Sequence, residues 1–229
     1  MKSLSDYYHL IKHKVSINNT LNRLRCFFVS HMRKKTFLLH GTQYPYLNHV
    51  YNHSWGNERS AEVPVVQKIV ADCSGSILEI GNVLSHYSLT HHEVVDKYER
   101  SPGVFNEDAV DFKAKTLYDL IVSISTFEHI GFDEEVKEPR KPLRAIENLL
   151  SYLTENGKMV ITIPIGYNKD LDDILRRGEI PFAERQCLKR ISYFNEWREA
   201  TWDEVSSLRF GKPYSNANGL VFLTFRRRI

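Results

Sequence analysis

Three acidic residues and one glycine lie in or just after apolar runs, where they could form a ligand-binding site. Glu79 lies inside "SILEIG", Asp96 closes "EVVD", and Asp108 follows "GVFNE". A carboxylate inside an apolar strand is costly unless it is hydrogen-bonded or paired. Asp96 and Asp108 could instead be solvated carboxylates at turns. The pattern predicts a ligand-binding turn after Glu79, where Gly81 lets the backbone approach a ligand.

The turn after Glu79 is poor in glycine. It reads "GNVLS" and carries the single glycine Gly81, whereas a phosphate-cradling loop would carry more. A pyrophosphate needs several backbone N–H groups converging at close range. The turn therefore disfavours a dinucleotide, although one glycine after a strand is a weak signal by itself.

Helical and strand patterns alternate around these residues. Residues 64–73 carry Val65, Val66, Ile69 and Val70 on one helical face, with Pro64 suited to the first turn. A second helix is predicted within residues 139–157, closed by Gly157 as its C-cap. The expected strands lie within residues 75–81, 92–99, 103–112, 118–126, 158–166, 187–195 and 219–228.

The strands predict the fold class. They are nearly continuous in apolar residues, as in a parallel sheet covered on both faces. We expect an α/β fold with a doubly wound, mostly parallel, seven-stranded Rossmann-like sheet and an N-terminal helical extension. The extension is assigned to residues 1–56 and the domain to 57–229. Residues 167–185 are polar without a strong period, so we interpret them as an excursion over the sheet edge.

Composition narrows the classes of protein. The 229 residues carry 31 Lys and Arg against 28 Asp and Glu, and this net charge of +3 argues against a polyelectrolyte binder. The three cysteines are far apart and lack metal-type spacing, which indicates reduced thiols in the cytoplasm. The sequence has no run of about 18 apolar residues and no secretory signal pattern. We therefore expect a cytoplasmic protein.

The N-terminal segment offers two alternatives. Residues 21–35 carry apolar side chains at helical spacing beside basic ones. An amphipathic helix packed on its own domain is the preferred interpretation, and a peripheral membrane contact is the alternative. The aromatic residues of 44–55 are predicted to pack on the core rather than to stack on a ligand, and Asn57, Glu58 and Arg59 could contact a ligand.

A family resemblance joins these motifs. In order and spacing, "ILEIG", "VVDKYE", "NEDAVDF", "YDLIVSISTFEHIG" and "GKMVITIPIG" resemble the motifs of class I S-adenosylmethionine-dependent methyltransferases. The resemblance covers residues 57–229 and is strongest to the small-molecule and sugar methyltransferases found with glycan-assembly genes. It implies S-adenosyl-L-methionine as cofactor, which has no phosphate and tolerates side chains in the first turn.

The resemblance also implies roles for individual residues. Glu79 would support the turn, Asp96 would accept hydrogen bonds from the ribose hydroxyls, and Asp108 would meet the adenine amino group. The implied cofactor-binding set is Glu79, Gly81, Asn82, Val83, Asp96, Lys97, Asp108, Ala109 and Ser125.

Methyl transfer to oxygen or nitrogen needs alignment and removal of a proton from the acceptor. His129 and Glu128 follow the fourth strand and are the candidate catalytic residues; His129 could instead hold the loop or contact the cofactor. The acidic run Asp133, Glu134, Glu135 and Glu138 could hold a divalent metal, but we favour a solvated helix start and predict no metal site.

The predicted function is methyl transfer from S-adenosylmethionine to a small-molecule or glycan acceptor. A nucleic-acid methyltransferase is one alternative, with the basic helix and Arg226, Arg227 and Arg228 as its footprint. The modest net charge, the lack of a separate binding domain and the sequence "SISTFEH" after the fourth strand, in place of an Asn-Pro-Pro-aromatic motif, argue against it. A non-catalytic binding or scaffold protein is the other alternative, because the first turn is poor in glycine.

Overall fold

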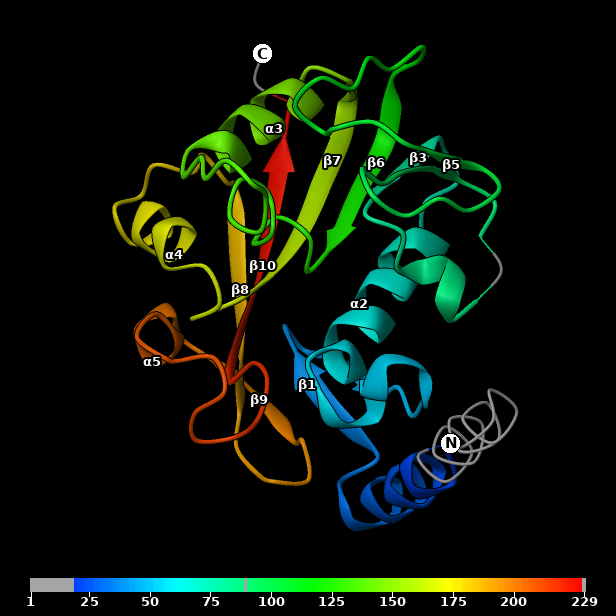
Figure 1. The fold of residues 1–229 in the computed structure, drawn as a ribbon, viewed down its shortest axis with the longest axis vertical. Coiled ribbons are helices and arrows are strands. Elements are labelled where there is room, and N and C mark those ends of the chain that lie inside the picture. Colours follow the sequence, from blue (N-terminus) through cyan, green and yellow to red (C-terminus); the bar gives the residue numbers. More distant parts are fainter. Residues whose placement is uncertain (1–18, 89, 228–229) are drawn as a thin grey trace, which may run out of the picture.

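An eight-stranded sheet forms the centre of the computed structural model, which describes residues 19–88 and 90–227 (Figure 1). Its strand order is β5-β4-β3-β6-β7-β10-β8-β9. The first five strands in this order, from β5 to β7, run parallel to one another. β10 is antiparallel to both β7 and β8. The strands are β3 (Ile77–Ile80), β4 (Glu93–Val95), β5 (Val104–Phe105), β6 (Tyr118–Ile124), β7 (Leu153–Pro164), β8 (Glu184–Arg190), β9 (Trp197–Ala200) and β10 (Gly219–Arg226).

The predicted doubly wound, mostly parallel sheet is confirmed, with eight strands where seven were expected. The additional strand is β9, which pairs antiparallel with β8 at the sheet edge. Only Trp197 of its four residues is buried. Such a short and largely polar edge strand has no apolar run by which it could be recognised.

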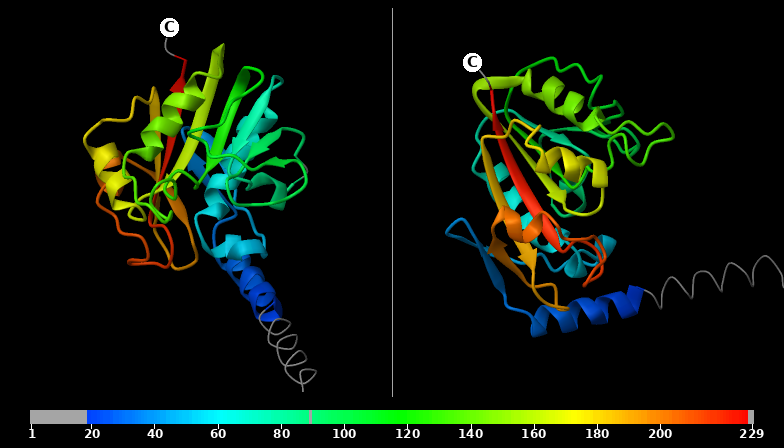
Figure 2. Two further views of the ribbon diagram at one scale, coloured as in Figure 1. Left: turned by 45° about the horizontal axis from the view of Figure 1, so that its top comes forward. Right: turned by 90° about the vertical axis from the view of Figure 1, so that its left-hand side faces the viewer.

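Helices cover both faces of the sheet (Figure 2). On one face, Val63 and Val66 of α2 (Arg59–Ala71) pack with Val122 of β6. On the other, α3 (Lys141–Leu150) and α4 (Lys169–Arg176) pack against a core that includes Ile121. Neighbouring residues of β6 thus enter opposite cores, and for this reason Leu120, Ile121 and Val122 are apolar in succession. The short helices are η1 (Tyr51–Gly56), η2 (Leu84–His86) and α5 (Trp202–Val205).

A hairpin of β1 (Thr36–Leu39) and β2 (Thr42–Pro45) connects the N-terminal helix to the domain. Phe37, Leu39 and Tyr46 are buried in one cluster with Trp197 and residues of α2 and β10. Tyr46 also donates its hydroxyl to the Trp197 carbonyl at 3.3 Å. The Tyr46 side chain therefore packs on the core, which is the interpretation preferred for this aromatic segment.

Two predicted helix boundaries are wrong. α2 begins at Arg59, so Pro64 lies inside the helix rather than in its first turn. Proline has no N–H, and the Ser60 carbonyl that would have accepted it instead accepts Leu47 N–H at 2.9 Å. This exchange explains how the helix tolerates Pro64 and how the N-terminal segment is tied to it.

α3 ends at Leu150, so Gly157 is not its C-cap. Gly157 belongs to β7, and a Cβ there would lie 2.8 Å from the Tyr118 carbonyl oxygen. The glycine permits a close approach of the two strands where their register shifts, between Tyr118 and Leu120.

The excursion at 167–185 contains a helix that the sequence analysis did not predict. α4 is capped by Asn168, whose side-chain oxygen accepts Leu171 N–H at 3.1 Å. Leu171, Ile174 and Leu175 are buried at helical spacing. Eight residues supply only this one apolar row, which is too short to stand out among the surrounding charges.

The N-terminal helix, described over residues 19–32, does not pack its apolar face on the domain. The preferred interpretation of this segment is therefore wrong. Its outward side chains are Leu21, Leu24, Phe27, Phe28 and Met32, which are between 46% and 64% exposed. Among the described residues, no helix has both the length and the apolar content needed to cross a membrane. All three cysteines are free thiols, as expected.

Candidate functional site

Glu79 organises the turn after β3. Its side chain is fully buried, and Oε1 accepts the N–H groups of Val83 at 2.9 Å and Leu84 at 2.8 Å. Oε2 lies 2.8 Å from His92 Nε2, which is itself nearly buried. In a phosphate-binding loop such N–H groups face the ligand. Here they are occupied by the chain's own carboxylate.

Gly81 is required by its conformation and by its neighbours. Its φ is +83°, and a Cβ would lie 2.2 Å from Thr126 Oγ1. Its N–H donates to the Val95 carbonyl of β4 at 2.8 Å. The turn is thus held against β4 and close to the segment that follows β6, where a side chain at position 81 would clash with Thr126.

This crowding gives a stability prediction with a matched control. Gly41 has a similar φ of +75°, but a Cβ added there would meet nothing within 4 Å, so Gly41→Ala should cost only the conformational strain of about 1 to 2 kcal/mol. Gly81→Ala should cost about 1 to 2 kcal/mol more, because Thr126 must also move. Chemical denaturation measures both free energies of unfolding. Equal losses would show that contact with Thr126 is unimportant.

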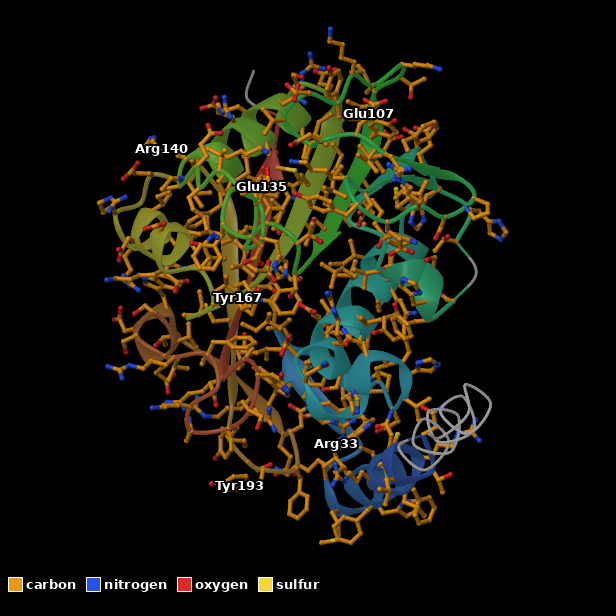
Figure 3. The ribbon with its side chains drawn as sticks, in the orientation of Figure 1. Arg33, Glu107, Glu135, Arg140, Tyr167 and Tyr193 are labelled. Carbon is orange, nitrogen blue, oxygen red and sulfur yellow. The ribbon has the colours of Figure 1, made fainter. Side chains whose placement is uncertain are left out.

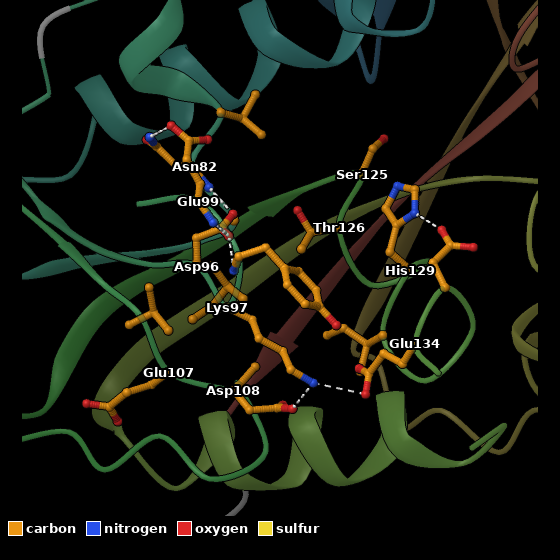
Figure 4. A pocket seen from close by; sticks show the side chains of 18 of the residues that line it. Asn82, Asp96, Lys97, Glu99, Glu107, Asp108, Ser125, Thr126, His129 and Glu134 are labelled. Atoms are coloured by element: carbon orange, nitrogen blue, oxygen red, sulfur yellow. Dashed lines mark hydrogen bonds and ion pairs between the residues drawn. The ribbon is translucent and has the colours of Figure 1, made fainter. Parts of the chain in front are cut away.

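Asp96 joins the turn after β3, called the first turn, to the turn after β4. It follows β4, and its Oδ1 accepts the N–H groups of Tyr98 at 2.8 Å and Glu99 at 2.7 Å. Its Oδ2 accepts Asn82 N–H from the first turn at 3.1 Å, and Asn82 Nδ2 donates to Glu99 Oε1 at 2.7 Å (Figure 4). Both turns therefore hold their shape through carboxylates of the chain itself.

A cavity of about 480 Å³ opens beside these turns at the carboxyl ends of β3, β4 and β6. This is the edge where open α/β sheets bind ligands. Nine of the eleven residues predicted for the site line it: Gly81, Asn82, Val83, Asp96, Lys97, Asp108, Ala109, Ser125 and His129. The structure thus brings together residues from four segments of the sequence.

The lining of this cavity is acidic. Among the described residues that line it, the arginine and lysine side chains are those of Arg59 and Lys97. Its carboxylates are Asp96, Glu99, Glu107, Asp108, Asp133 and Glu134. This excess of carboxylates over arginine and lysine disfavours a ligand that carries several phosphates.

Four alternating charges lie at one side of the cavity, and Figure 4 shows three of them: Lys97 between Asp108 and Glu134. Asp108 Oδ2 lies 2.6 Å from Lys141 Nζ and 2.9 Å from Lys97 Nζ. Glu134 is paired with the same lysines, at 2.6 and 3.0 Å. Partial burial acts to raise the pKa of Asp108, but the hydrogen bonds from Lys141 and Lys97 outweigh it and lower the pKa to about 2. Asp108 is therefore ionised at neutral pH.

Ser125, directly after β6, adopts a strained backbone. Its φ is +40°, which is uncommon for a residue with a side chain. Its hydroxyl donates to the buried Glu62 at 2.7 Å, and its N–H donates to Thr162 Oγ1 at 2.9 Å. Glu62 is also paired with Arg59 at 3.0 Å. Strain supported by buried partners is typical of functional sites, and here it lies in the cavity wall.

His129 is held at the cavity by a carboxylate. Its Nδ1 lies 2.5 Å from Asp133 Oδ2, which also accepts the Tyr167 hydroxyl at 2.8 Å. Tyr167 lies beyond the carboxyl end of β7 (Figure 3). Its ring meets the His129 ring edge-on at 4.8 Å. Burial acts to raise the pKa of Asp133, but hydrogen bonds from His129 and Tyr167 lower it. An ionised Asp133 favours the tautomer with the proton on Nδ1, which leaves Nε2 as an acceptor.

Glu79 and Glu128 are the two predicted site residues outside the cavity lining. Glu128 is 2% exposed, and its Oε2 has no hydrogen-bond partner among the described residues. Burial raises the pKa of Glu128 well above the ordinary value. This burial therefore favours the neutral form of the Glu128 carboxyl group.

The acidic run after His129 is not a helix start, because the next helix begins at Lys141. Asp133 bonds His129 and Glu134 is paired with two lysines, so these carboxylates shape the cavity wall instead. Within residues 19–88 and 90–227, no group of three His, Cys, Asp or Glu side chains could hold a metal ion.

Sequence reasoning missed part of the lining. Arg59 was named only as an alternative, and Asp133 only as part of the acidic run. The spacing His129 to Asp133 places two polar side chains one helical turn apart and could have suggested a pair. No pattern could have indicated Glu107, Tyr98 or Thr126.

Comparison with known proteins identifies no family. No protein-family model matches the chain, and no curated protein matches it. Among solved structures, the N-methyltransferase NodS of Bradyrhizobium japonicum with S-adenosyl-L-homocysteine is 15% identical over 75% of this chain and 88% of that one, at a TM-score of 0.46.

Two further structures have similar statistics. A possible histamine N-methyltransferase of Thermotoga maritima is 15% identical over 74% of this chain and 91% of that one, at a TM-score of 0.45. The sugar N-methyltransferase KedS8 of Streptoalloteichus is 13% identical over 86% and 99%, at a TM-score of 0.38. Similarity at this level carries no functional argument, so the function is inferred from the site.

Proposed function

We propose that this protein is an S-adenosylmethionine-dependent methyltransferase acting on a small-molecule or glycan acceptor. The observation that carries the proposal is the first turn, whose Val83 and Leu84 N–H groups are bound by Glu79. A dinucleotide would find no converging donors there for its pyrophosphate. A nucleoside ligand without phosphate needs none, and it suits an acidic cavity at this edge of the sheet.

The lining residues fit the parts of this cofactor. In this proposal Asp96 and Glu99 would accept hydrogen bonds from the ribose hydroxyls, since each retains accepting capacity beyond its bonds to the turns. Arg59 would pair with the cofactor's carboxylate. Val83 and Ala109 offer apolar contact for the adenine, with Asp108 nearby. When bound, S-adenosylmethionine supplies an electrophilic methyl group on a sulfonium sulfur.

The chain's own contribution to the reaction is alignment and proton removal. The residues that line the cavity would align the acceptor's oxygen or nitrogen with the methyl group that S-adenosylmethionine would supply. His129 Nε2 takes the proton that the acceptor loses, and Asp133 orients the ring and stabilises the imidazolium. Each step thus has a named group in or beside the cavity.

The partner and location predictions remain part of this proposal. Arg226 is 3.8 Å from Glu184 and Arg227 donates to the Leu153 carbonyl, so these arginines have partners within the domain. Arg228 lies outside the described residues. The basic N-terminal helix lies at the other end of the molecule from the end of β10, so the helix and Arg226 do not form one nucleic-acid footprint (Figure 1). We propose a cytoplasmic location on the basis of the free thiols.

Isothermal titration calorimetry tests the cofactor. S-Adenosylmethionine and S-adenosylhomocysteine should each bind with a stoichiometry of one. NADH should show no binding under the same conditions, because its phosphates would face carboxylates without compensating donors. Binding of NADH with no binding of S-adenosylmethionine would overturn the proposal. Binding of the cofactor without turnover on any amine, hydroxyl or nucleic-acid acceptor would instead support the non-catalytic alternative.

A further inference from the structure

The outward face of the N-terminal helix is a continuous apolar surface. Leu21, Leu24, Phe28 and Met32 recur at spacings of three and four residues, and Phe27 lies beside them. Each is about half exposed or more. We call this set the outer face. Helices of globular proteins normally turn such a stripe toward their own core.

The inward face of the same helix is held by polar contacts. Asn22 Nδ2 donates to the Val50 carbonyl at 2.9 Å, and Trp55 Nε1 donates to Asn22 Oδ1 at 2.6 Å. Just beyond the helix, Arg33 is 3% exposed and donates to Asn48 Oδ1 at 2.6 Å. The helix is therefore anchored in this orientation, with its apolar side away from the domain.

The tip of the β8–β9 hairpin extends the outer face. The Phe28 and Phe194 rings lie 6.3 Å apart, and Lys34 N–H donates to the Glu196 carboxylate at 3.1 Å. Tyr193, at the same end of the molecule as Arg33 (Figure 3), is 80% exposed. Phenylalanine and tyrosine are common where a protein meets the interface of a membrane.

Positive charge is concentrated on this part of the chain. Residues 1–57 contain eight Lys and Arg and a single acidic residue, Asp6, whereas residues 58–229 contain 23 Lys and Arg against 27 Asp and Glu. Arg23 and Arg25 flank the outer face and are exposed, as are Lys34 and Lys35 just after the helix. An anionic surface would thus attract this end of the molecule and repel the acidic remainder.

We propose that the outer face is a docking site for an anionic membrane surface, on which the helix lies in the interfacial plane. The combination of an outward apolar stripe, aromatic side chains and flanking arginines is that of an interfacial amphipathic helix. In this arrangement the helix is held at one end of the molecule (Figure 2), and the domain stays in water. The inference does not depend on the proposed methyl transfer.

Vesicle sedimentation with the full-length chain tests it. The protein should bind vesicles of phosphatidylcholine with about 30% phosphatidylserine, and bind phosphatidylcholine alone at least about tenfold more weakly. Phe27→Ser with Phe28→Ser should weaken binding to the anionic vesicles by about 30-fold, because two half-exposed aromatic rings lose their burial in lipid. Arg23→Gln with Arg25→Gln should weaken it about tenfold or more.

Phe105 and Leu117 provide a matched control. They are 46% and 45% exposed and lie in β5 and directly before β6, away from the N-terminal helix (Figure 1), so Phe105→Ser with Leu117→Ser should leave vesicle binding unchanged. Thermal unfolding checks that every variant is folded. Equal binding to neutral and anionic vesicles would overturn the proposal. Absence of binding to both kinds of vesicle would also overturn it. If sedimentation velocity then shows a self-association that Phe27→Ser with Phe28→Ser abolishes, the outer face is an interface between two copies.

Discussion

His129→Ala should lower the turnover number about 10²- to 10⁴-fold, while the affinity for S-adenosylmethionine changes only a few-fold. A general base acts on the chemical step, so its loss appears in turnover rather than in cofactor binding. His129 lines the cavity, and Asp133 holds its Nδ1 at 2.5 Å. Steady-state kinetics with an amine or hydroxyl acceptor found by screening, and calorimetry with the cofactor, measure the two quantities.

Two further variants separate a base from a structural histidine. Added imidazole should partly restore turnover to His129→Ala, which a purely structural role would not allow. Asp133→Asn should give a smaller loss and shift the pH profile of turnover, because it removes the charge that orients His129. His91→Ala, an exposed histidine of another cavity, should have no effect. If His129→Ala loses cofactor binding, His129 is a cofactor-binding residue rather than the base. If the variant keeps full activity, His129 is not the base.

The sequence could predict the central parallel strands β3 and β6 because both are largely buried. β6 carries Leu120, Ile121 and Val122 in succession, and Ile124 follows after one serine; this pattern needs no knowledge of distant residues. β9 and α4 lack such a signal, since both are short and half polar. Their positions are decided by contacts with β8 and the core rather than by local pattern.

The site could be predicted where it depends on strand ends. Gly81, Asp96 and Ser125 follow β3, β4 and β6, and parallel strands bring their carboxyl ends to one edge. The partners of these residues could not be predicted in the same way. Asp108 is bound by Lys141, 33 residues further along the chain, and no spacing in the sequence indicates this pair. Nor could the outward turn of the N-terminal helix be predicted, because periodicity identifies an apolar face but not its orientation.

Asp96→Ala should weaken the binding of S-adenosylmethionine about 100-fold, near the upper end expected for a charge-assisted hydrogen bond. The variant loses the proposed bond to the ribose and also the acceptor that holds Asn82, Tyr98 and Glu99 N–H groups in place. The cavity would therefore be less preorganised as well as short of one contact. Calorimetry at several protein concentrations measures the affinity.

Asp119→Ala is the control that separates these effects from a general loss of stability. Asp119 accepts Ser76 N–H at 2.9 Å and the Thr154 hydroxyl at 2.9 Å, but at the amino end of β6, opposite the cavity. Both variants should unfold at lower denaturant concentration, because each frees polar groups that a carboxylate had bound. Only Asp96→Ala should lose cofactor affinity. Equal affinities in the two variants would remove Asp96 from the cofactor site and leave it the role of joining the two turns.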